Sequence, residues 1–400
     1  MKKNTALDTT LLPLIVLTRC CGFLPNWSDP RNTSRVRSAL SWIAVSLMTV
    51  LQMSMALFQI IQTRITFSKD SNIHSIALNV IWLVPSVTSL FIQIRFIVSA
   101  RSLVILLQDW RNFEASLKSD DSKRGINWVR LIYGCTVSSG IMSMVGVYFL
   151  IAGKPEESYL LSYYSLFRRR GLKTLAFFCQ LFHVFFMKVM LVISDLVPAF
   201  FFYHVSLVVQ TLSLQIESLH PFTSVTQIIP DSVQILMLPN DSSRRRIQSL
   251  RSNYNHLCKF VNKANGLFGS TIIVSQTFQF FFICLMFYKS LYGLVHSNSD
   301  LFTYQMALFH YIYNLVSSVL LASHLKGAVR DFRNRFSNFV TDCWPFLSRD
   351  DKESAMAFSH ELQVNQLAVK PLNLYTVEPK LLLSIGSLIT TYVIILLQSN

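Results

Sequence analysis

The stretch LLLSIGSLITTYVIILLQSN, residues 381–400, decides the fold of this chain. It can cross a bilayer as a helix, because about 20 mostly apolar residues span the hydrocarbon core. Small and polar residues interrupt its apolar run, and it ends with Thr391-Tyr392, five apolar residues and Gln398. Such a helix can line a pore as well as anchor a protein in lipid, and the rest of the chain must distinguish the two roles.

Composition places the whole chain in a membrane. Hydrophobic residues make up 52% of the 400 residues and charged residues only 14%, whereas ordinary globular domains carry about 25% charged residues. The mean hydropathy is +0.41. The net charge is +15, but most Lys and Arg lie between apolar segments, which is typical of a cytoplasmic membrane face and not of nucleic-acid binding. The seven cysteines contain no CxxC pair, so we expect no disulfide framework, metal site or cofactor.

Seven segments approach the length and hydropathy of a membrane span. Lys and Arg are more abundant on the cytoplasmic side of membrane proteins, and this bias sets the orientation. With the amino terminus inside, the inner segments hold 24 basic residues and the outer segments 8, although five of these 8 lie in the outer loop 153–173. We therefore expect an all-α membrane protein with a cytosolic amino terminus and an extracellular carboxyl terminus. The predicted spans are 39–62, 75–100, 128–152, 174–198, 268–294, 302–323 and 379–398.

Helical periodicity continues beyond membrane depth in three places: after Pro198, where we expect a kink, before the fifth span, and in 325–344. Three adjoining amphipathic segments favour a helical bundle below the membrane over separate interfacial helices. The expected division is a cytosolic amino-terminal segment at 1–38, spans one to four at 39–211, cytosolic helical extensions and a loop at 212–267, spans five and six at 268–323, cytosolic anchor helices at 324–378 and a pore-lining seventh span at 379–400.

Three stretches resemble the insect gustatory receptor family: TTYVIILLQ at 390–398, NYNHLCKFVNKANGLFGS at 253–270, and PLIVLTRCCGFLP at 13–25. The first fits the family's Thr-Tyr, five apolar residues, Gln pattern, but Ser399 stands where the family usually has Phe. The resemblance implies a ligand-gated cation channel in the plasma membrane of sensory neurons, opened by a small-molecule tastant. It further implies a homo- or hetero-tetramer of related receptors, with a central cytosolic anchor, one shared pore and a ligand pocket in the outer half of each subunit.

The last helix then gains a candidate pore face. Ser384, Leu388, Thr391, Ile395 and Gln398 recur at helical spacing. Hydroxyls deep in the pore and a bulky aliphatic residue above them suit a wet pore that is closed by a hydrophobic constriction. We expect Ile395 to form the constriction and Gln398 to be its polar neighbour. The alternative is that these polar groups hold helices together. Without Asp or Glu on this face, strong divalent selectivity is not expected.

A candidate ligand site follows from polar and aromatic residues in predicted spans, since aromatic faces with a few hydrogen-bonding groups suit a small polar or amphipathic ligand. We expect these residues in the outer halves of their spans; each alone is better explained as a packed or interfacial side chain, and the prediction rests on the set. Lys188 also shares a face with Asp195, and the two charges can pair. Arg95 is expected to reach membrane lipid phosphate. The set is Trp82, His183, Lys188, Gln276, Gln279, Tyr304, Gln305, His310 and Tyr311, with Asn314 beside the last two.

Two other functional classes remain open. A G-protein-coupled receptor also has seven helices, but it places its amino terminus outside, and the chain lacks a DRY-like motif after span three and NPxxY in span seven. A transporter predicts inverted repeats and broken helices at midspan, which the sequence does not suggest. An enzyme is not expected, because the histidines are scattered and no HExxH or paired catalytic motif is present.

Overall fold

The computed structural model describes residues 35–69, 73–117, 126–153, 173–217, 240–295, 301–365 and 367–398. Within these ranges every regular element is a helix, so the all-α class is confirmed. The elements are α2 (Arg35–Lys69), α3 (Ile73–Ser116), α4 (Ile126–Gly153), α6 (Lys173–Glu217), α7 (Asn240–Val295), α8 (Leu301–Cys343), η2 (Trp344–Phe346), α9 (Arg349–Val364), η3 (Pro371–Asn373) and α10 (Pro379–Gln398).

Each of the seven predicted spans lies within one of these helices. In the part of the chain that the structure describes, five helices are long and apolar enough to cross a membrane by length and composition, namely α2, α3, α6, α7 and α8. The other two candidates, α4 and α10, carry shorter apolar stretches, Gly134–Val145 and Pro379–Ile395. α6 continues through Pro198 to Glu217, so the helix predicted beyond this proline is present and unbroken.

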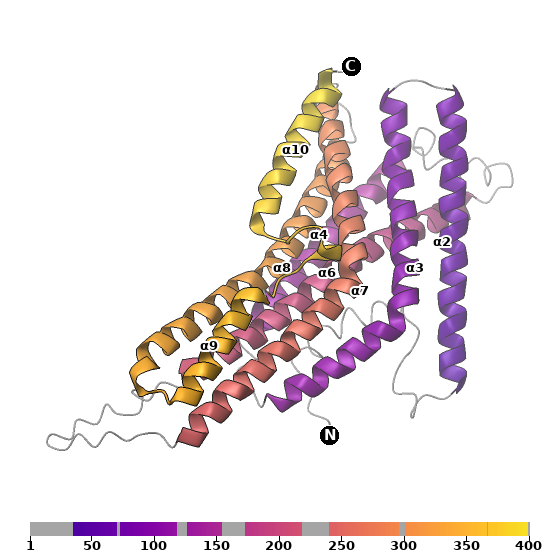
Figure 1. Cartoon of the computed structure of the whole chain (residues 1–400). Helices are drawn as coiled ribbons and strands as arrows, with labels where there is room; N and C mark the ends of the chain where they lie inside the picture. Colours follow the sequence, from indigo (N-terminus) through magenta and orange to yellow (C-terminus); the bar gives the residue numbers. More distant parts are fainter. Residues whose placement is uncertain are drawn as a thin grey trace.

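The long helices α6, α7 and α8 run past the level at which α10 begins and continue into a second lobe, where α9 lies beside them (Figure 1). The amphipathic faces found in the sequence are turned into this lobe: Leu257, Val261 and Ala264 of α7 and Phe332 and Phe336 of α8 are buried. Burial of an apolar face is the main source of stability for such helices in water. We refer to this lobe, formed by the ends of α6, α7 and α8 together with α9, as the anchor bundle.

An aromatic cluster fills the anchor bundle. Tyr254 stacks on Phe332 with ring centroids 5.6 Å apart, and Phe336 meets Phe358 of α9 edge-on at 4.7 Å. All four side chains are buried, and each aromatic ring of this kind removes about 150–250 Å² from water. The Tyr254 hydroxyl donates to the backbone oxygen of Asn365 at 2.8 Å, which satisfies the polar end of that ring. α9 is thereby fixed to α7 and α8 just before the chain turns toward α10.

Candidate functional site

α10 lies at the edge of the helical assembly and packs along α7 and α8 (Figure 1). Its inward face holds Val393, which is buried, with Ile385 and Ile389 half-buried against the core. All five residues of the candidate pore face, Ser384, Leu388, Thr391, Ile395 and Gln398, are exposed on the surface of the single chain. Leu388 and Ile395 keep 51% and 53% of their surface accessible. The predicted face is therefore free to meet other copies of the chain, lipid or water, as are other exposed positions of α10 such as Leu383, Tyr392 and Ile394.

Hydroxyl groups on α10 bond to their own helix. Thr391 donates to the backbone oxygen of Ser387 at 3.0 Å, and Ser384 donates to that of Lys380 at 3.4 Å. A Ser or Thr hydroxyl that is satisfied in this way needs no partner on a neighbouring helix. Among the described residues, no hydrogen bond joins these two side chains to another helix, so the structure gives no support to a role in holding helices together within one chain.

A buried polar cluster lies where α4, α6 and α8 meet. His310 of α8 is 1% exposed; its Nδ1 lies 2.9 Å from the Ser139 hydroxyl of α4, and its Nε2 lies 3.1 Å from the Asn314 amide nitrogen. Lys188 of α6 donates to the Ser143 hydroxyl, one turn of α4 beyond Ser139. Two predicted ligand residues, His310 and Lys188, are thus brought to the same helix, α4. We call Ser139, Ser143, Lys188, His310 and Asn314 the polar cluster.

His183 occupies a second polar contact on α6. Its Nε2 lies 3.3 Å from the Ser86 hydroxyl of α3, and the same hydroxyl donates to the Met187 sulfur at 3.2 Å. His183 and Ser86 are both buried. A buried ionisable side chain in an apolar helix is costly, and such groups usually face the protein interior or a cavity. His183 therefore faces α3, whereas Lys188 faces α4.

The alternative that Lys188 pairs with Asp195 is wrong. Among the described residues no ion pair joins them, because each has a different partner. Asp195 accepts hydrogen bonds from Ser275, at 2.5 Å, and from Gln279, both on α7. The two charged side chains lie about two turns apart on α6 and point toward different neighbouring helices.

The expectation that Gln276 and Gln279 lie in the outer half of their span does not fit the structure when the anchor bundle is taken as the cytosolic end, as the sequence predicts. α7 rises from the anchor bundle, so residues early in its apolar segment lie near the start of α10 and not near its end (Figure 1). Gln276 accepts a hydrogen bond from Tyr375, which belongs to the connector that precedes α10. These two glutamines therefore lie between the anchor bundle and the polar cluster.

The remaining predicted ligand residues differ in their surroundings. Tyr311 is buried, and its ring centroid lies 4.3 Å from that of Phe282. Tyr304 is half-buried near the core, whereas Gln305 is exposed and does not line the interior of the single chain. Trp82 lies in α3, outside the residues whose side chains the structure describes. Only His183, Lys188, His310 and Tyr311 of the predicted set lie in the interior near the polar cluster.

The connector between α9 and α10, residues 365–378, is held closely to α7. The side chain of Asn265 donates to the backbone oxygen of Ala368 and accepts from the backbone N–H of Lys370, both at 3.0 Å. Leu372 and Asn373 have φ values of +47° and +58°, a left-handed backbone conformation that residues other than glycine adopt only at a cost in free energy. Burial raises the pKa of Tyr375 to about 12, so its hydroxyl stays protonated and donates to Gln276 at neutral pH.

Sequence reasoning missed the serines and the connector. Ser139 and Ser143 are four residues apart on α4, and this spacing places both on one face of the helix. The shared face could have been predicted from the sequence. Tyr375 and Asn265 had no such signal, because their partners are 99 and more than 100 positions away in the chain.

The chain was compared with known proteins. Among curated proteins, none matches the sequence. The solved structure of the insect olfactory receptor OR5 from Machilis hrabei is similar, with a TM-score of 0.73 and 15% identity over 98% of this chain and 99% of that one. The same receptor in complex with eugenol gives 0.70 and 13% over the same shares. At these identities the likeness shows the fold alone.

A match by sequence assigns the family. The family described as 7tm chemosensory receptor matches residues 11–400, nearly the whole chain. It is a family of receptors and not of enzymes, and it favours neither of the two alternatives, a G-protein-coupled receptor or a transporter, that the sequence left open. The chain belongs to the 7tm chemosensory receptor family.

Proposed function

We propose that the chain is a gustatory receptor: a ligand-gated, non-selective cation channel of the plasma membrane of sensory neurons, opened by a small-molecule tastant. The observation that carries the proposal is the division of α10 into two faces. Ile385, Ile389 and Val393 pack on α7 and α8. The five residues of the candidate pore face, Ser384, Leu388, Thr391, Ile395 and Gln398, stay exposed. An exposed face with hydroxyls at one end and an amide at the other suits water and ions better than lipid.

In this proposal four chains, of one or of related kinds, place their α10 helices around one pore. The amino terminus and the anchor bundle are cytosolic, and α10 runs outward. Ile395 forms the hydrophobic constriction, which closes the pore by excluding water, and Gln398 is the polar group beside it. The face carries no carboxylate, so we expect monovalent and divalent cations to pass without strong preference.

The ligand site in this proposal is the region of His183, Lys188, His310 and Tyr311. Its support is that these side chains are gathered in the interior, where three of them have hydrogen-bonding partners from α3 and α4. Ligand pockets combine apolar and aromatic walls with a few convergent polar groups. The related olfactory receptor OR5 was solved with eugenol. Two imidazoles and an amine favour a polar or amphipathic ligand here, and this supports a tastant over a volatile odorant.

Cysteine accessibility tests the pore assignment. Thr391→Cys lies on the proposed pore face, and Ile389→Cys, two residues away, lies on the face that packs against the protein. In cells expressing the channel, a water-soluble thiol reagent should block ligand-evoked current through Thr391→Cys and leave Ile389→Cys unaffected. Equal insensitivity of both variants would contradict a pore at this face. A panel of sugars, bitter compounds and amino acids would supply the agonist.

A further inference from the structure

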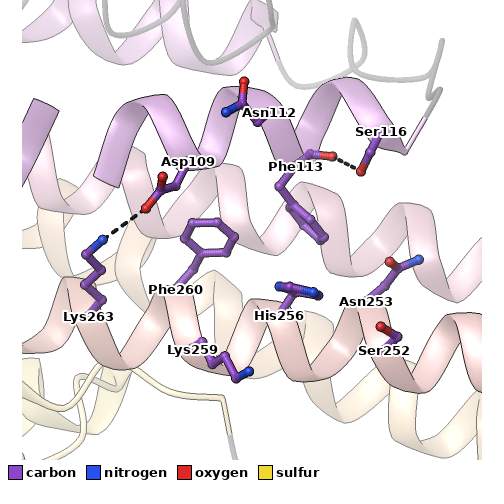
Figure 2. Close-up of a pocket in the computed structure, with 10 residues that line it drawn as sticks. All are labelled: Asp109, Asn112, Phe113, Ser116, Ser252, Asn253, His256, Lys259, Phe260 and Lys263. Atoms are coloured by element: carbon purple, nitrogen blue, oxygen red, sulfur yellow. Dashed lines mark hydrogen bonds and ion pairs between the residues drawn. The ribbon is translucent and has the colours of Figure 1, made fainter. Parts of the chain in front are cut away.

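A cavity of about 570 Å³ lies between the last turns of α3 and the first half of α7 (Figure 2). None of the residues that line it belongs to the polar cluster or to α10. We call it the α3–α7 groove. Four of its α7 residues, Ser252, His256, Lys259 and Lys263, recur at helical spacing and so share one face. The full lining is Asp109, Asn112, Phe113, Ser116, Ser252, Asn253, His256, Lys259, Phe260 and Lys263.

Aromatic rings give the groove a preformed wall. The centroids of Phe113 and Phe260 are 5.5 Å apart, and Trp110, fully buried behind them, lies 5.5 Å from Phe260. The imidazole of His256 is held 6.0 Å from Phe113 at an interplanar angle of 34°. Packed rings lose little conformational entropy when a ligand binds, because the fold already holds them in place.

Charge in the groove is positive. The one carboxylate of the lining, Asp109, forms an ion pair with Lys263 at 3.0 Å. Among the described residues, Lys259 has no ion pair or hydrogen bond, and its side chain is exposed at the groove. Ser252, Asn253 and the imidazole of His256 add donors along the same helix. The carboxylate is paired, the Lys259 ammonium is not, and further hydrogen-bond donors lie beside it. This arrangement disfavours a metal cation and favours an anion.

The groove also lies close to the level where the apolar segments begin. Lys263 precedes the start of the predicted fifth span, residue 268, by five residues, roughly 7 Å along a helix. Ser252 is a further 11 residues away, roughly 16 Å. The Asp109–Lys263 end of the groove is thus within reach of a lipid headgroup, while the other end opens away from the apolar segments.

We infer that the α3–α7 groove binds a phosphate-bearing ligand, with Lys259 as its principal charge contact and His256, Asn253 and Ser252 as additional donors. Hydrogen bonds from an ammonium to phosphate are among the strong ones, and hydroxyl and amide donors complete such a site. Two sources present this chemistry, the headgroup of an anionic membrane lipid and a free phosphorylated polyol. The inference uses none of the pore or tastant assignments, so it can fail or succeed apart from them.

The test uses the full-length receptor in nanodiscs of phosphatidylcholine. One arm titrates fluorescent inositol trisphosphate as the soluble probe. The other adds phosphatidylinositol bisphosphate to the nanodisc and measures lipid retained on the receptor by native mass spectrometry. We expect saturable binding in at least one arm. Lys259→Ala should weaken it about tenfold, as for loss of one charge-assisted hydrogen bond, and Lys259→Arg should stay within about threefold of the parent.

Arg246→Ala is the matched control, because Arg246 is exposed on the same helix outside the groove. It removes the same charge and should leave binding unchanged. Elution as a single species and an unchanged unfolding temperature would show that each variant is folded. Saturable binding of either probe supports the site. Binding of the lipid alone identifies a lipid headgroup as the source, binding of the soluble probe alone identifies a free phosphorylated polyol, and binding of both shows that the site accepts either. Absence of saturable binding in both arms, or equal loss in Arg246→Ala and Lys259→Ala, overturns the inference.

Discussion

The hydroxyl of Tyr375 donates a hydrogen bond to the side-chain oxygen of Gln276 and so joins the connector before α10 to α7. One turn further along α7, Gln279 donates to Asp195 of α6, and Ser275 donates to the same carboxylate. α6 also carries Lys188 of the polar cluster. The proposed ligand region and the segment that positions α10 are therefore both attached to the α6–α7 pair, Lys188 through α6 and Tyr375 through α7.

Loss of the Tyr375–Gln276 bond should impair gating. Tyr375→Phe leaves the buried Gln276 without this partner, which costs about 1 kcal/mol or more, and this corresponds to about a fivefold change in an equilibrium constant. We expect the agonist concentration for half-maximal current to shift by about that factor. Spatial proximity alone does not establish coupling. A double-mutant cycle with Gln276→Leu should therefore show that the double variant is no worse than either single one.

Leu374→Ala serves as the control for this cycle. Leu374 is the neighbour of Tyr375 in the connector and is 71% exposed, so its truncation removes no packed contact. Its dose–response curve should match that of the parent. If Leu374→Ala shifts the curve as much as Tyr375→Phe does, the effect belongs to the connector as a whole and not to the hydrogen bond.

Ile395→Ala should raise the current that flows without agonist. In the proposed pore a smaller side chain widens the hydrophobic constriction and lowers the cost of wetting it. Val393→Ala, two residues earlier on the buried face, should instead reduce the amount of folded receptor, because a cavity replaces a packed side chain at about 1–3 kcal/mol. Whole-cell current normalised to surface protein separates the two effects. An unchanged basal current in Ile395→Ala would show that Ile395 does not form the constriction.

The anchor bundle should lose an ion pair in acid. A hydrogen bond from Arg251 lowers the pKa of Glu361. The lowered pKa means that the stabilisation is complete above the ordinary glutamate pKa and is lost as pH falls through the lowered value. We expect Glu361→Gln to unfold about 1–3 °C below the parent at pH 7, since a partly exposed pair contributes at most about 1 kcal/mol.

This difference in unfolding temperature should narrow as pH falls below the ordinary glutamate pKa and through the lowered pKa of Glu361, where the parent's carboxylate also becomes neutral. Scanning fluorimetry of the receptor in detergent measures it. Asp350→Asn is the comparison, because its pair with Arg244 is more exposed, at 65% and 50%, and should give a smaller difference. A gap that widens in acid would contradict the assignment of the lowered pKa to the folded state.

The proposed orientation predicts that the natural glycosylation sequon at Asn240 stays unmodified, because it then lies in the cytosol. Tyr163→Asn makes a new sequon with Ser165, between α4 and α6 in the sequence, in a segment that the same orientation places outside. Only the variant should show a shift in mass that a glycosidase removes. Glycosylation of the natural protein at Asn240 would show that the proposed orientation is wrong and that this side of the protein faces outward.

Hydropathy and helical period were enough to predict the helices, because every apolar segment of the chain must form one in a bilayer. They also predicted which face of α7 and α8 is buried in the anchor bundle, since Leu257 and Phe332 repeat with the helix. The same period predicted a pore face on α10 that includes Thr391 and Ile395, and both side chains are exposed in the single chain.

Pairing across helices could not be read in this way. The depth of Gln276 could have been, because it lies eight residues after the start of the predicted span 268–294, which runs outward, and so belongs to the inner half of that span. Lys188 and Asp195 share a face by spacing, yet each bonds to a different helix. Such pairings depend on the three-dimensional placement of α4 and α7, which the local sequence does not contain.

Gly269 permits the close approach of the connector to α7. A Cβ at this position would lie 2.7 Å from the backbone nitrogen of Leu372, and backbone cannot move aside as a flexible side chain can. Leu372 already has a left-handed φ of +47°, so the connector has little freedom to adjust. We expect Gly269→Ala to lower the unfolding temperature and surface expression, and to weaken gating in the receptor that remains.

Gly266, three residues earlier on the same helix, separates this effect from helix propensity. A Cβ there meets no atom within 4 Å, and its residue is exposed. Gly266→Ala should therefore stabilise α7 slightly, by up to about 1 kcal/mol, since alanine favours a helix over glycine. Opposite signs for the two substitutions, measured as unfolding temperatures under one condition, are the expected result. Stabilisation by both would mean that the connector does not need the close contact at Gly269, and that α10 is positioned by the hydrogen bonds of Asn265 and Tyr375 alone.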